Sequence, residues 1–263
     1  MGRKLVFTSG KGGVGKTTMC ANIGIALSML GHKVVMVDAD IGLNNLDVVM
    51  CMENKVTYDI ADVVDGKCRL KQALIEDVDF PGLFVLPSFH NYDTANFTAS
   101  NFKSIIDTLA VGFDFVIIDC PAGIDAGFHR AVVAASEAYV VTTPHISAVR
   151  DADKVMALLN GYPLVNIGLV INRVRGDMVV LGDMMTAGDI SRLLRCTPTG
   201  VVPDDDSITV KSDIMRHKLE CEVKQALMML AENISSGKRT VYDCTNDYRG
   251  VFGRWKAKVK KLF

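Results

Sequence analysis

Two lysines stand close together in the glycine-rich segment FTSGKGGVGKTT, residues 7–18. The spacing from Gly10 to Thr17 fits the phosphate-loop pattern, in which glycines leave backbone N–H groups free to face phosphate oxygens. Lys16 would meet the β- and γ-phosphates of a nucleotide, and the Thr17 hydroxyl would lie against a Mg²⁺ ion bound to them. The pattern needs only one lysine, so Lys11 requires a separate explanation.

Three aspartates could complete such a phosphate site, because each follows an apolar run. Asp38 and Asp40 end KVVMVDAD, and Asp119 ends FVIID. In a parallel sheet, ligands bind beyond the carboxyl ends of the strands. There Asp38 and Asp119, with the Thr17 hydroxyl, would hold Mg²⁺ directly or through water. Asp40 would hold an attacking or a metal-bound water, although any one of the three aspartates could instead be an ordinary cap or turn residue.

Further positions are predicted to contact a nucleotide. Gly123, in DCPAG, could turn its backbone N–H toward the γ-phosphate. Asn172, at the end of GLVIN, and the turn VPDD lie where a purine base would be read by amide and backbone groups, with an ordinary loop as the alternative for both. The predicted ATP-binding residues are Gly10, Lys11, Gly12, Gly13, Val14, Gly15, Lys16, Thr17, Thr18, Gly123, Asn172, Pro203 and Asp204.

A mostly parallel sheet is needed to bring these residues together, and the sequence predicts one. Apolar, β-branched runs predict strands at 4–7, 33–40, 83–88, 114–121, 138–144, 166–174 and 199–205. Helical periodicity predicts helices after residue 16 and at about 101–111, 127–136, 147–160 and 183–195. This alternation predicts an α/β fold, in which a twisted, mostly parallel sheet carries helices on both faces. We expect one P-loop domain over residues 1–236.

Composition argues against several classes of protein. The sequence has no apolar run long enough to span a membrane as a helix. The first predicted strand begins at residue 4, so we expect no signal peptide. The seven cysteines show no C-x-x-C spacing, which argues against a disulfide framework, a zinc site or a redox pair.

The chain ends in YRGVFGRWKAKVKKLF, which holds six of the 29 Lys and Arg side chains and no acidic side chain. On a helix, the basic residues, among them Arg254, Lys258 and Lys261, would lie outside an apolar face formed by Val251, Phe252, Trp255, Val259, Leu262 and Phe263. This pattern predicts an amphipathic helix over 251–263 that lies on an anionic bilayer surface, joined to the domain by a flexible tether over 237–250. Gly253 weakens a helix and the segment is short, so we expect it to be mostly disordered in water. A helix docked on the protein's own body and a nucleic-acid-binding tail are the alternatives.

Four segments, KGGVGKTT, VDADIGLNNLD, IIDCPAG and SAVRDADKV, resemble the deviant Walker A ATPases of the MinD/ParA group. The resemblance covers essentially the whole chain. The order of the four segments, together with the basic amphipathic ending, is closest to the branch that selects the division site. The resemblance implies that Lys11 crosses to the nucleotide of a second subunit and that Asp40 positions the attacking water. Lys11, Lys16 and Asp40 would then be the catalytic residues.

The same resemblance implies an ATPase cycle at a membrane. The protein would bind ATP and Mg²⁺, dimerise with ATP and bind the inner face of the cytoplasmic membrane through its C-terminal helix. It would recruit a division inhibitor of the MinC type and return to the cytoplasm after hydrolysis. The helix that carries Ser147, Asp151 and Asp153 would contact protein partners, including an activator of the MinE type or a polar anchor protein. An ordinary solvated helix face is the alternative.

Other functions stay open at this point. A ParA-type DNA-partition ATPase would use the basic tail on DNA, but aromatic residues at helical spacing argue against nucleic acid as a partner. The flagellar-number relative of this group typically carries an extension before the first strand, and only three residues precede that strand here. An iron–sulfur reductase of the nitrogenase type bridges a cluster with two cysteines from each subunit, and Cys120, beside Asp119, does not match that pattern. A non-enzymatic scaffold would use ATP only to dimerise.

Overall fold

A computed structural model of the protein describes residues 1–42, 45–88, 97–205, 213–217 and 220–260. Within these residues, eight strands form one sheet in the order β3-β4-β2-β5-β1-β6-β7-β8. The strands are β1 (Arg3–Thr8), β2 (Val34–Asp38), β3 (Ile75–Glu76), β4 (Leu83–Leu86), β5 (Phe115–Asp119), β6 (Glu137–Thr142), β7 (Asn166–Val174) and β8 (Pro198–Pro203). Every neighbouring pair is parallel except β3 with β4, which confirms the predicted mostly parallel sheet.

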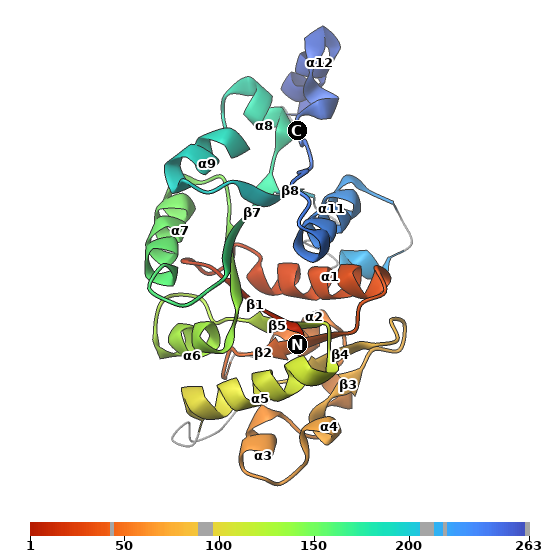
Figure 1. Ribbon diagram of the computed structural model, residues 1–263. Coiled ribbons are helices and arrows are strands. Elements are labelled where there is room, and N and C mark those ends of the chain that lie inside the picture. Colours follow the sequence, from red (N-terminus) through yellow and green to blue (C-terminus); the bar gives the residue numbers. More distant parts are fainter. Residues whose placement is uncertain (43–44, 89–96, 206–212, 218–219, 261–263) are drawn as a thin grey trace.

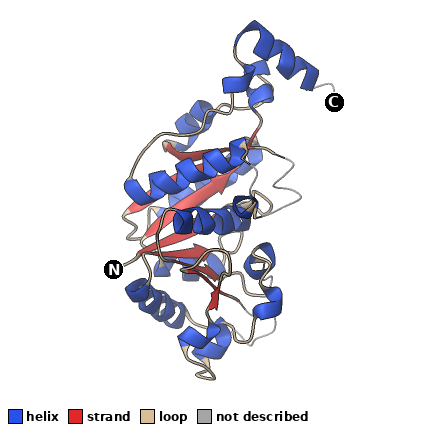
Figure 2. Cartoon of the chain, turned by 90° about the vertical axis from the view of Figure 1, so that its right-hand side faces the viewer, coloured by secondary structure: helices blue, strands red, loops and turns tan. Residues whose placement is uncertain are grey.

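Helices cover both faces of this sheet, as Figure 1 and Figure 2 show. One face carries α1 (Lys16–Met29), α2 (Leu46–Val49) and α11 (Glu222–Ser236), and the other carries α5 (Ala99–Gly112), α6 (Ala126–Ala134), α7 (Ile146–Leu159) and α9 (Ala187–Leu194). The shorter or peripheral helices are α3 (Ile60–Val64), α4 (Leu70–Ala73), α8 (Gly176–Leu181), α12 (Gly250–Lys260), η1 (Glu53–Lys55), η3 (Ile214–Arg216) and η4 (Asn246–Tyr248). The predicted α/β class is therefore confirmed. Across the described parts of the chain, none of the helices is both long and apolar enough to cross a bilayer.

The sheet has a separate apolar core on each face, because side chains alternate along a strand. On β1, Leu5 and Phe7 pack toward α1 and α11, whereas Val6 packs toward α5, α6 and α7. All three side chains are fully buried. Since both faces are covered, the strands appear in the sequence as nearly continuous apolar runs, and this is why their positions could be predicted closely.

Helix α11 is not among the predicted helices, although the sequence carries a signal for it. It packs against α1 and β8. Its buried apolar residues follow helical spacing and are Val223, Ala226, Leu227, Leu230, Ala231 and Ile234. Counting that spacing over 222–236 would have found the helix. The antiparallel strand β3, in contrast, has two residues, too few for any pattern.

The C-terminal segment is packed on the body, which differs from the expected flexible tether and unfolded tail. Within 237–250, the turn η4 forms, and Cys244 and Tyr248 are buried. Because the segment is mostly polar, its composition predicted a flexible tether and did not indicate that Cys244 and Tyr248 are buried. Helix α12 follows, contacts α8 and η4, and projects beyond the β8 edge of the sheet in Figure 1. The division into domain, tether and terminal helix stays a prediction; the tail residues outside the described part are Lys261, Leu262 and Phe263.

Candidate nucleotide-binding site

The glycine-rich loop lies between the end of β1 at Thr8 and the start of α1 at Lys16. Gly13 and Gly15 have left-handed backbone angles, with φ of 79° and 92°, which glycine adopts without strain. A Cβ on Gly15 would lie 2.5 Å from the side-chain nitrogen of Asn172. The loop therefore needs glycine for its turns and for the close approach of β7. It leads into the N-terminus of a helix, where free N–H groups and the helix dipole favour anions.

Lys16 and two of the predicted aspartates meet beside this loop. Strands β2 and β5 are neighbours, and their register places Asp38 directly opposite Asp119. Lys16 Nζ lies 2.8 Å from Asp119 Oδ1, and all three side chains are buried. Although burial opposes it, the charge of Asp119 raises the pKa of Lys16, which keeps the ammonium charged.

Asp38 also shapes the turn that follows β2. Its carboxylate accepts hydrogen bonds from three backbone N–H groups of this turn, the nearest being that of Asp40 at 2.9 Å. Burial and the charge of Asp119 raise the pKa of Asp38 to about 7. Burial also raises the pKa of Asp40, and the charge of Lys16 opposes this rise. Asp40 therefore lies half-buried within reach of the field of Lys16, at the rim of the site.

The buried charges of this site fit a divalent cation. Asp119 pairs with Lys16, and the buried carboxyl group of Asp38, with its pKa raised to about 7, lies opposite Asp119, so a bound cation would favour the ionised form of Asp38. Carboxylate oxygens suit Mg²⁺, which usually keeps several water and phosphate ligands as well. Thr17 follows Lys16 at the start of α1 and adds a hydroxyl. Among the described residues, no three His, Cys, Asp or Glu side chains form a metal-binding group, so phosphate and water would supply the other ligands.

Lys11 extends away from the buried ion pair. Its Nζ lies 3.4 Å from Ser147 Oγ at the start of α7, and its side chain is exposed. Lys16, in contrast, is only 7% exposed. Lys11 lines a cavity of about 480 Å³ together with the neighbouring glycines, His145 and Arg173. The two lysines of the loop therefore lie in different environments: Lys16 is buried in an ion pair with Asp119, and Lys11 is at the surface beside Ser147.

Helix α7, predicted to contact protein partners, lies directly against the phosphate loop. A Cβ on Gly10 would lie 2.5 Å from the backbone carbonyl carbon of Asp151. Asp151 also pairs with Lys154 at 3.2 Å, and Asp153 is exposed on the same helix. Of the three predicted partner residues, Ser147 and Asp151 thus touch the loop and Asp153 faces solvent.

Replacing Gly10 with alanine is expected to weaken nucleotide binding by roughly tenfold or more, since a misplacement of about 1 Å in a site costs on the order of 10². The new Cβ would overlap the backbone of Asp151, so the loop would have to move off α7. Titration with a fluorescent ATP analogue measures the loss. Gly188→Ala on α9 is the matched control, because its Cβ would meet only Thr186 Oγ1, at 3.6 Å. Unchanged affinity in Gly10→Ala would contradict a tight contact between loop and helix.

Asn172 sits in a bulge of β7, which the sequence does not reveal. The register of β7 and β8 shifts between Ile171 and Val174, and Arg173 within the bulge has a left-handed φ of 57°. Bulges re-aim side chains, and here Asn172 Nδ2 donates to the Val14 carbonyl at 2.9 Å. The buried Asn172 Oδ1 has no partner within the described ranges. Asn172 thus braces the loop and keeps one acceptor available.

The remaining predicted contacts lie nearby. Pro203 pairs with Val174 at the end of β8, and the Asp204 N–H donates to the Val174 carbonyl at 3.0 Å. The turn VPDD is therefore adjacent to the bulge of β7. Gly123 has a φ of 94°, and its N–H donates to the Ser9 carbonyl at 3.3 Å. To face a phosphate, as predicted, this N–H would have to leave Ser9.

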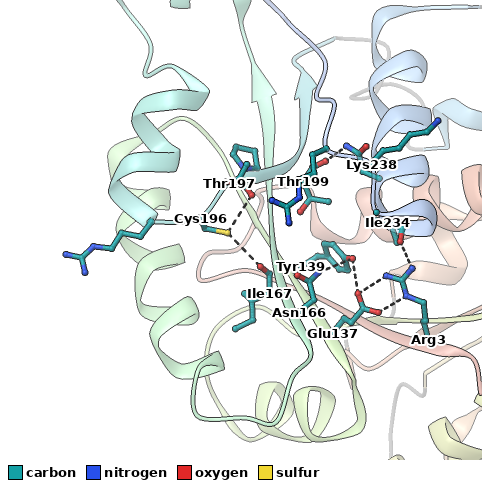
Figure 3. A pocket seen from close by; sticks show the side chains of 15 residues that line it. Arg3, Glu137, Tyr139, Asn166, Ile167, Cys196, Thr197, Thr199, Ile234 and Lys238 are labelled. Atoms are coloured by element: carbon teal, nitrogen blue, oxygen red, sulfur yellow. Dashed lines mark hydrogen bonds and ion pairs between the residues drawn. The ribbon is translucent and has the colours of Figure 1, made fainter.

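A cavity of about 540 Å³ lies at the end of the sheet where the parallel strands begin, opposite the end that carries the phosphate loop (Figure 3). Arg3 pairs through two nitrogens with both carboxylate oxygens of Glu137, at 2.7 and 2.8 Å, and the Tyr139 hydroxyl donates to Glu137 at 3.2 Å. Arg3 also donates to the Ile234 carbonyl in α11. These bonds join β1, β6 and α11, so this cavity is built around a structural ion pair remote from the phosphate loop.

All seven cysteines are free thiols in the structure. Cys120, beside Asp119, is fully buried, and burial raises the pKa of its thiol to about 12. A buried, protonated thiol cannot reach a cluster shared with a second subunit. The structure therefore argues against the iron–sulfur reductase alternative.

Known proteins are similar to this chain in sequence. A protein-family model described as an AAA domain matches residues 2–161. The septum site-determining protein MinD of Bacillus subtilis (strain 168) is 46% identical over 215 residues, which cover 81% of this chain and 80% of that protein. The region matched by the family model includes the phosphate loop and all three aspartates of the site.

Solved structures share the fold. The MinC:MinD cell division protein complex of Aquifex aeolicus aligns with a TM-score of 0.81 and 34% identity, over 90% of this chain and 97% of that chain. The MinD of Pyrococcus horikoshii OT3 complexed with Mg-ADP aligns with a TM-score of 0.81 and 29% identity, also over 90% of this chain and 97% of that chain. On this evidence from sequence and fold together, the chain belongs to the MinD family of septum site-determining ATPases.

Proposed function

We propose that this ATPase acts as a nucleotide-dependent dimer that binds and leaves a membrane. The observation that carries the proposal is the separation of the two lysines. Lys16 lies buried with Asp119, and Lys11 extends to the surface at Ser147. A lysine at the surface beside the phosphate loop is suited to reach the triphosphate of a second subunit. The Mg-ADP complex of the relative from Pyrococcus horikoshii supports the choice of nucleotide and metal.

Each residue of the site has a proposed role in ATP hydrolysis. Lys16 and the loop amides would hold the β- and γ-phosphates, and Lys16 would leave Asp119 to do so. Asp119, Asp38 and the Thr17 hydroxyl would then hold Mg²⁺. When bound, Mg²⁺ neutralises charge on the phosphate oxygens. Asp40, at the rim of the site, would orient the attacking water.

The adenine base would lie against the bulge of β7 and the turn after β8. Asn172 Oδ1 is buried and accepts no hydrogen bond from the residues that the structure describes. An exocyclic amino group of a purine would satisfy it. Pro203 and Asp204 flank the same position and would contribute backbone contacts.

Helix α7 is the proposed contact for protein partners. In the complex from Aquifex aeolicus, a MinD chain is assembled with MinC. We propose that a division inhibitor of the MinC type meets Ser147, Asp151 and Asp153 in this chain, and that an activator of the MinE type or a polar anchor protein uses the same helix. Because α7 touches the phosphate loop, partner binding and nucleotide state would be linked.

Helix α12 is the proposed membrane contact. Phe252 is 89% exposed and Trp255 is 68% exposed, while Arg254 and Lys258 are exposed on the same helix. Exposed aromatic side chains flanked by cations suit the interface of an anionic bilayer. We therefore propose a peripheral location at the inner face of the cytoplasmic membrane.

Dimerisation would convert weak membrane binding to strong binding. One short helix with few apolar contacts binds a bilayer reversibly, much as a single lipid anchor does. Two such helices on one dimer make the second insertion intramolecular, which raises avidity by about 10² to 10⁴. Hydrolysis would separate the subunits and return each helix to weak binding.

Phe252→Glu and Trp255→Glu are each expected to lose most ATP-dependent binding to anionic vesicles while keeping ATP-driven dimerisation. Each substitution places a carboxylate on the exposed apolar face, against anionic lipid. Co-sedimentation with ATP, ADP and a non-hydrolysable analogue measures the loss, beside a DNA-binding assay. Val165→Glu is the matched control, because Val165 is an apolar residue of the body that is 80% exposed. Binding of the parent protein to DNA and not to vesicles would favour a partition-type function instead.

A further inference from the structure

The cavity of about 540 Å³ at the start of the parallel strands has more cations than anions in its lining (Figure 3). Its basic side chains are Arg3, Arg195, Lys238 and Arg239. Of the described residues that line it, Glu137 alone is acidic. Both carboxylate oxygens of Glu137 accept from Arg3, and one of them also accepts from the Tyr139 hydroxyl. The negative charge of the lining is therefore already neutralised.

Two of the four basic side chains keep their charge available to a ligand. Lys238 is not one of them, because its Nζ lies 2.8 Å from Glu232 Oε2. Arg195 and Arg239 are exposed, and within the described ranges no carboxylate pairs with either. A guanidinium group is a planar fork of N–H donors that binds phosphate or carboxylate through two parallel hydrogen bonds. The unpaired charge of the lining therefore suits an anion.

Both of these arginines follow the end of a helix. Arg195 ends α9 with a left-handed φ of 50°, at a position where glycine or asparagine is usual. Arg239 comes two residues after Gly237, which ends α11. Cations near a helix C-terminus stabilise the helix, whether or not a ligand binds. The last turn of α11, however, is already capped by Arg3, which donates to the Ile234 carbonyl.

A bulge in β8 adds a hydroxyl group to the lining of the same cavity. The pairing of β7 with β8 shifts between Leu169 and Val170, which leaves Thr199 of β8 as an extra residue in the ladder. Bulges re-aim side chains and are frequent beside functional sites. A Cβ on Gly168 would lie 2.6 Å from Thr199 Oγ1. The hydroxyl can therefore lie against β7 only because that residue is glycine.

The walls of the cavity are joined by a buried side chain. Asn233 on α11 is buried, and its Nδ2 donates at 2.8 Å both to the Thr199 carbonyl and to the Thr240 carbonyl. It thereby links the bulge of β8 to the segment that follows α11. Tyr139 and Ile234, which are both buried, add apolar surface. The cavity is thus formed before any ligand enters, and its volume is that of a small-molecule site, roughly 300–1,000 Å³.

We infer that this cavity is a binding site for a small organic anion, in which Arg195 and Arg239 hold a phosphate or carboxylate group and the Tyr139 ring lies against the apolar part of the molecule. The Thr199 hydroxyl donates a further hydrogen bond to the anion. The cavity and the phosphate loop lie at opposite ends of the sheet, so this ligand is distinct from the nucleotide. Its binding does not depend on the dimerisation or the membrane contact of the proposed function.

Four probes that share one aromatic ring test whether the ligand must be an anion: phenyl phosphate, benzoate, benzyl alcohol and benzylammonium. The full-length protein is saturated with Mg-ADP, so that its phosphate loop is occupied, and binding is followed by the NMR signals of the backbone amides. We expect phenyl phosphate and benzoate to shift the signals of residues 195–199 and 237–239 until these saturate. The neutral and the cationic probe should bind at least tenfold more weakly. Binding of the anions should weaken as salt is added.

Variants test the residues that would hold the anion. Arg195→Gln combined with Arg239→Gln should weaken the binding of phenyl phosphate by roughly tenfold or more, because the charge-assisted hydrogen bonds are lost. Thr199→Val replaces the hydroxyl with a methyl group and should weaken it severalfold. Arg192→Gln is the matched control, because Arg192 is also on α9, its side chain is 79% exposed and it does not line the cavity.

Each outcome decides the question. Saturable shifts at the cavity with only one of the two anions would support the site and restrict its ligand to phosphates or to carboxylates. Shifts elsewhere only, or none, would overturn it and leave Arg195 and Arg239 as charges that stabilise two helix ends. Equal binding of benzyl alcohol, or parent-like binding of phenyl phosphate in the double variant, would overturn it as well, because the cations would then not hold the ligand.

Discussion

Lys11→Ala is expected to bind nucleotide and to fail in ATP-dependent dimerisation, with hydrolysis reduced by roughly 10³-fold or more, the scale of other cations that act across an interface. Binding should survive because Lys16 and the loop amides remain in place. Dimerisation should fail because Lys11 is exposed beside the loop, 3.4 Å from Ser147 Oγ, and no carboxylate pairs with it in the part of the chain that the structure describes. The triphosphate of another subunit would offer it a charged partner.

Light scattering with excess ATP measures the dimer, and a fluorescent ATP analogue measures binding. Lys103→Ala is the matched control, because Lys103 is a half-buried lysine of α5 that pairs with Asp107 at 2.7 Å, remote from the loop. A normal ATP-bound dimer in Lys11→Ala would contradict the assignment of Lys11 to the second subunit. Loss of nucleotide binding as well would show that Lys11 acts on its own nucleotide.

Asp40→Ala is expected to dimerise with ATP and then to stay dimeric. If Asp40 orients the attacking water, the substitution removes chemistry and not binding, and positioned acid–base groups contribute about 10² to 10⁴ to rate. The buried Lys16–Asp119 pair and the turn held by Asp38 do not depend on the Asp40 side chain. Single-turnover hydrolysis, followed together with dimer lifetime, measures the effect.

Glu53→Ala, on the exposed turn η1, controls for the loss of a carboxylate elsewhere. Turnover of Asp40→Ala close to that of the parent protein would reassign the water to backbone groups or to another side chain. Loss of the ATP-bound dimer would instead place Asp40 in the interface. A stable dimer without hydrolysis is the result that supports the role proposed here.

The sheet and the charged centre of the site could be predicted because local sequence determines both. Strands that are buried on both faces must be apolar along their whole length. The carboxyl ends of parallel strands meet at one edge of the sheet, so the amino-acid sequence alone was enough to place Asp38 near Asp119. The phosphate loop is likewise one continuous segment, and the spacing of its glycines, lysine and threonine is enough to predict that it binds phosphate.

The contacts that join the loop to its surroundings could not be predicted, because they connect residues far apart in sequence. Nothing near Gly10 shows that it lies on the backbone of Asp151. The bulge that aims Asn172 at Val14 depends on the register of β7 with β8, which apolar periodicity leaves open. Such contacts are determined by the tertiary fold and not by the local sequence.

The terminal helix shows the same limit in another form. From sequence, Gly253 is a defect, since glycine weakens a helix. In the structure, the missing side chain lets α12 lie against Tyr248. A local rule gave the right cost but missed the contact with Tyr248 that offsets it, because the turn η4 that brings Tyr248 against the helix is not visible in the helical periodicity.

The rest position of Lys11 has a consequence for how a partner could distinguish the two forms of the protein. The ammonium lies 3.4 Å from the hydroxyl of Ser147 on α7. If Lys11 crosses to a second subunit, that hydroxyl is released, so a ligand that needs Ser147 competes with Lys11 in the monomer and meets no competitor in the dimer. Linkage between binding equilibria is reciprocal. Such a ligand would therefore draw subunits together as firmly as their association recruits it, without touching the nucleotide.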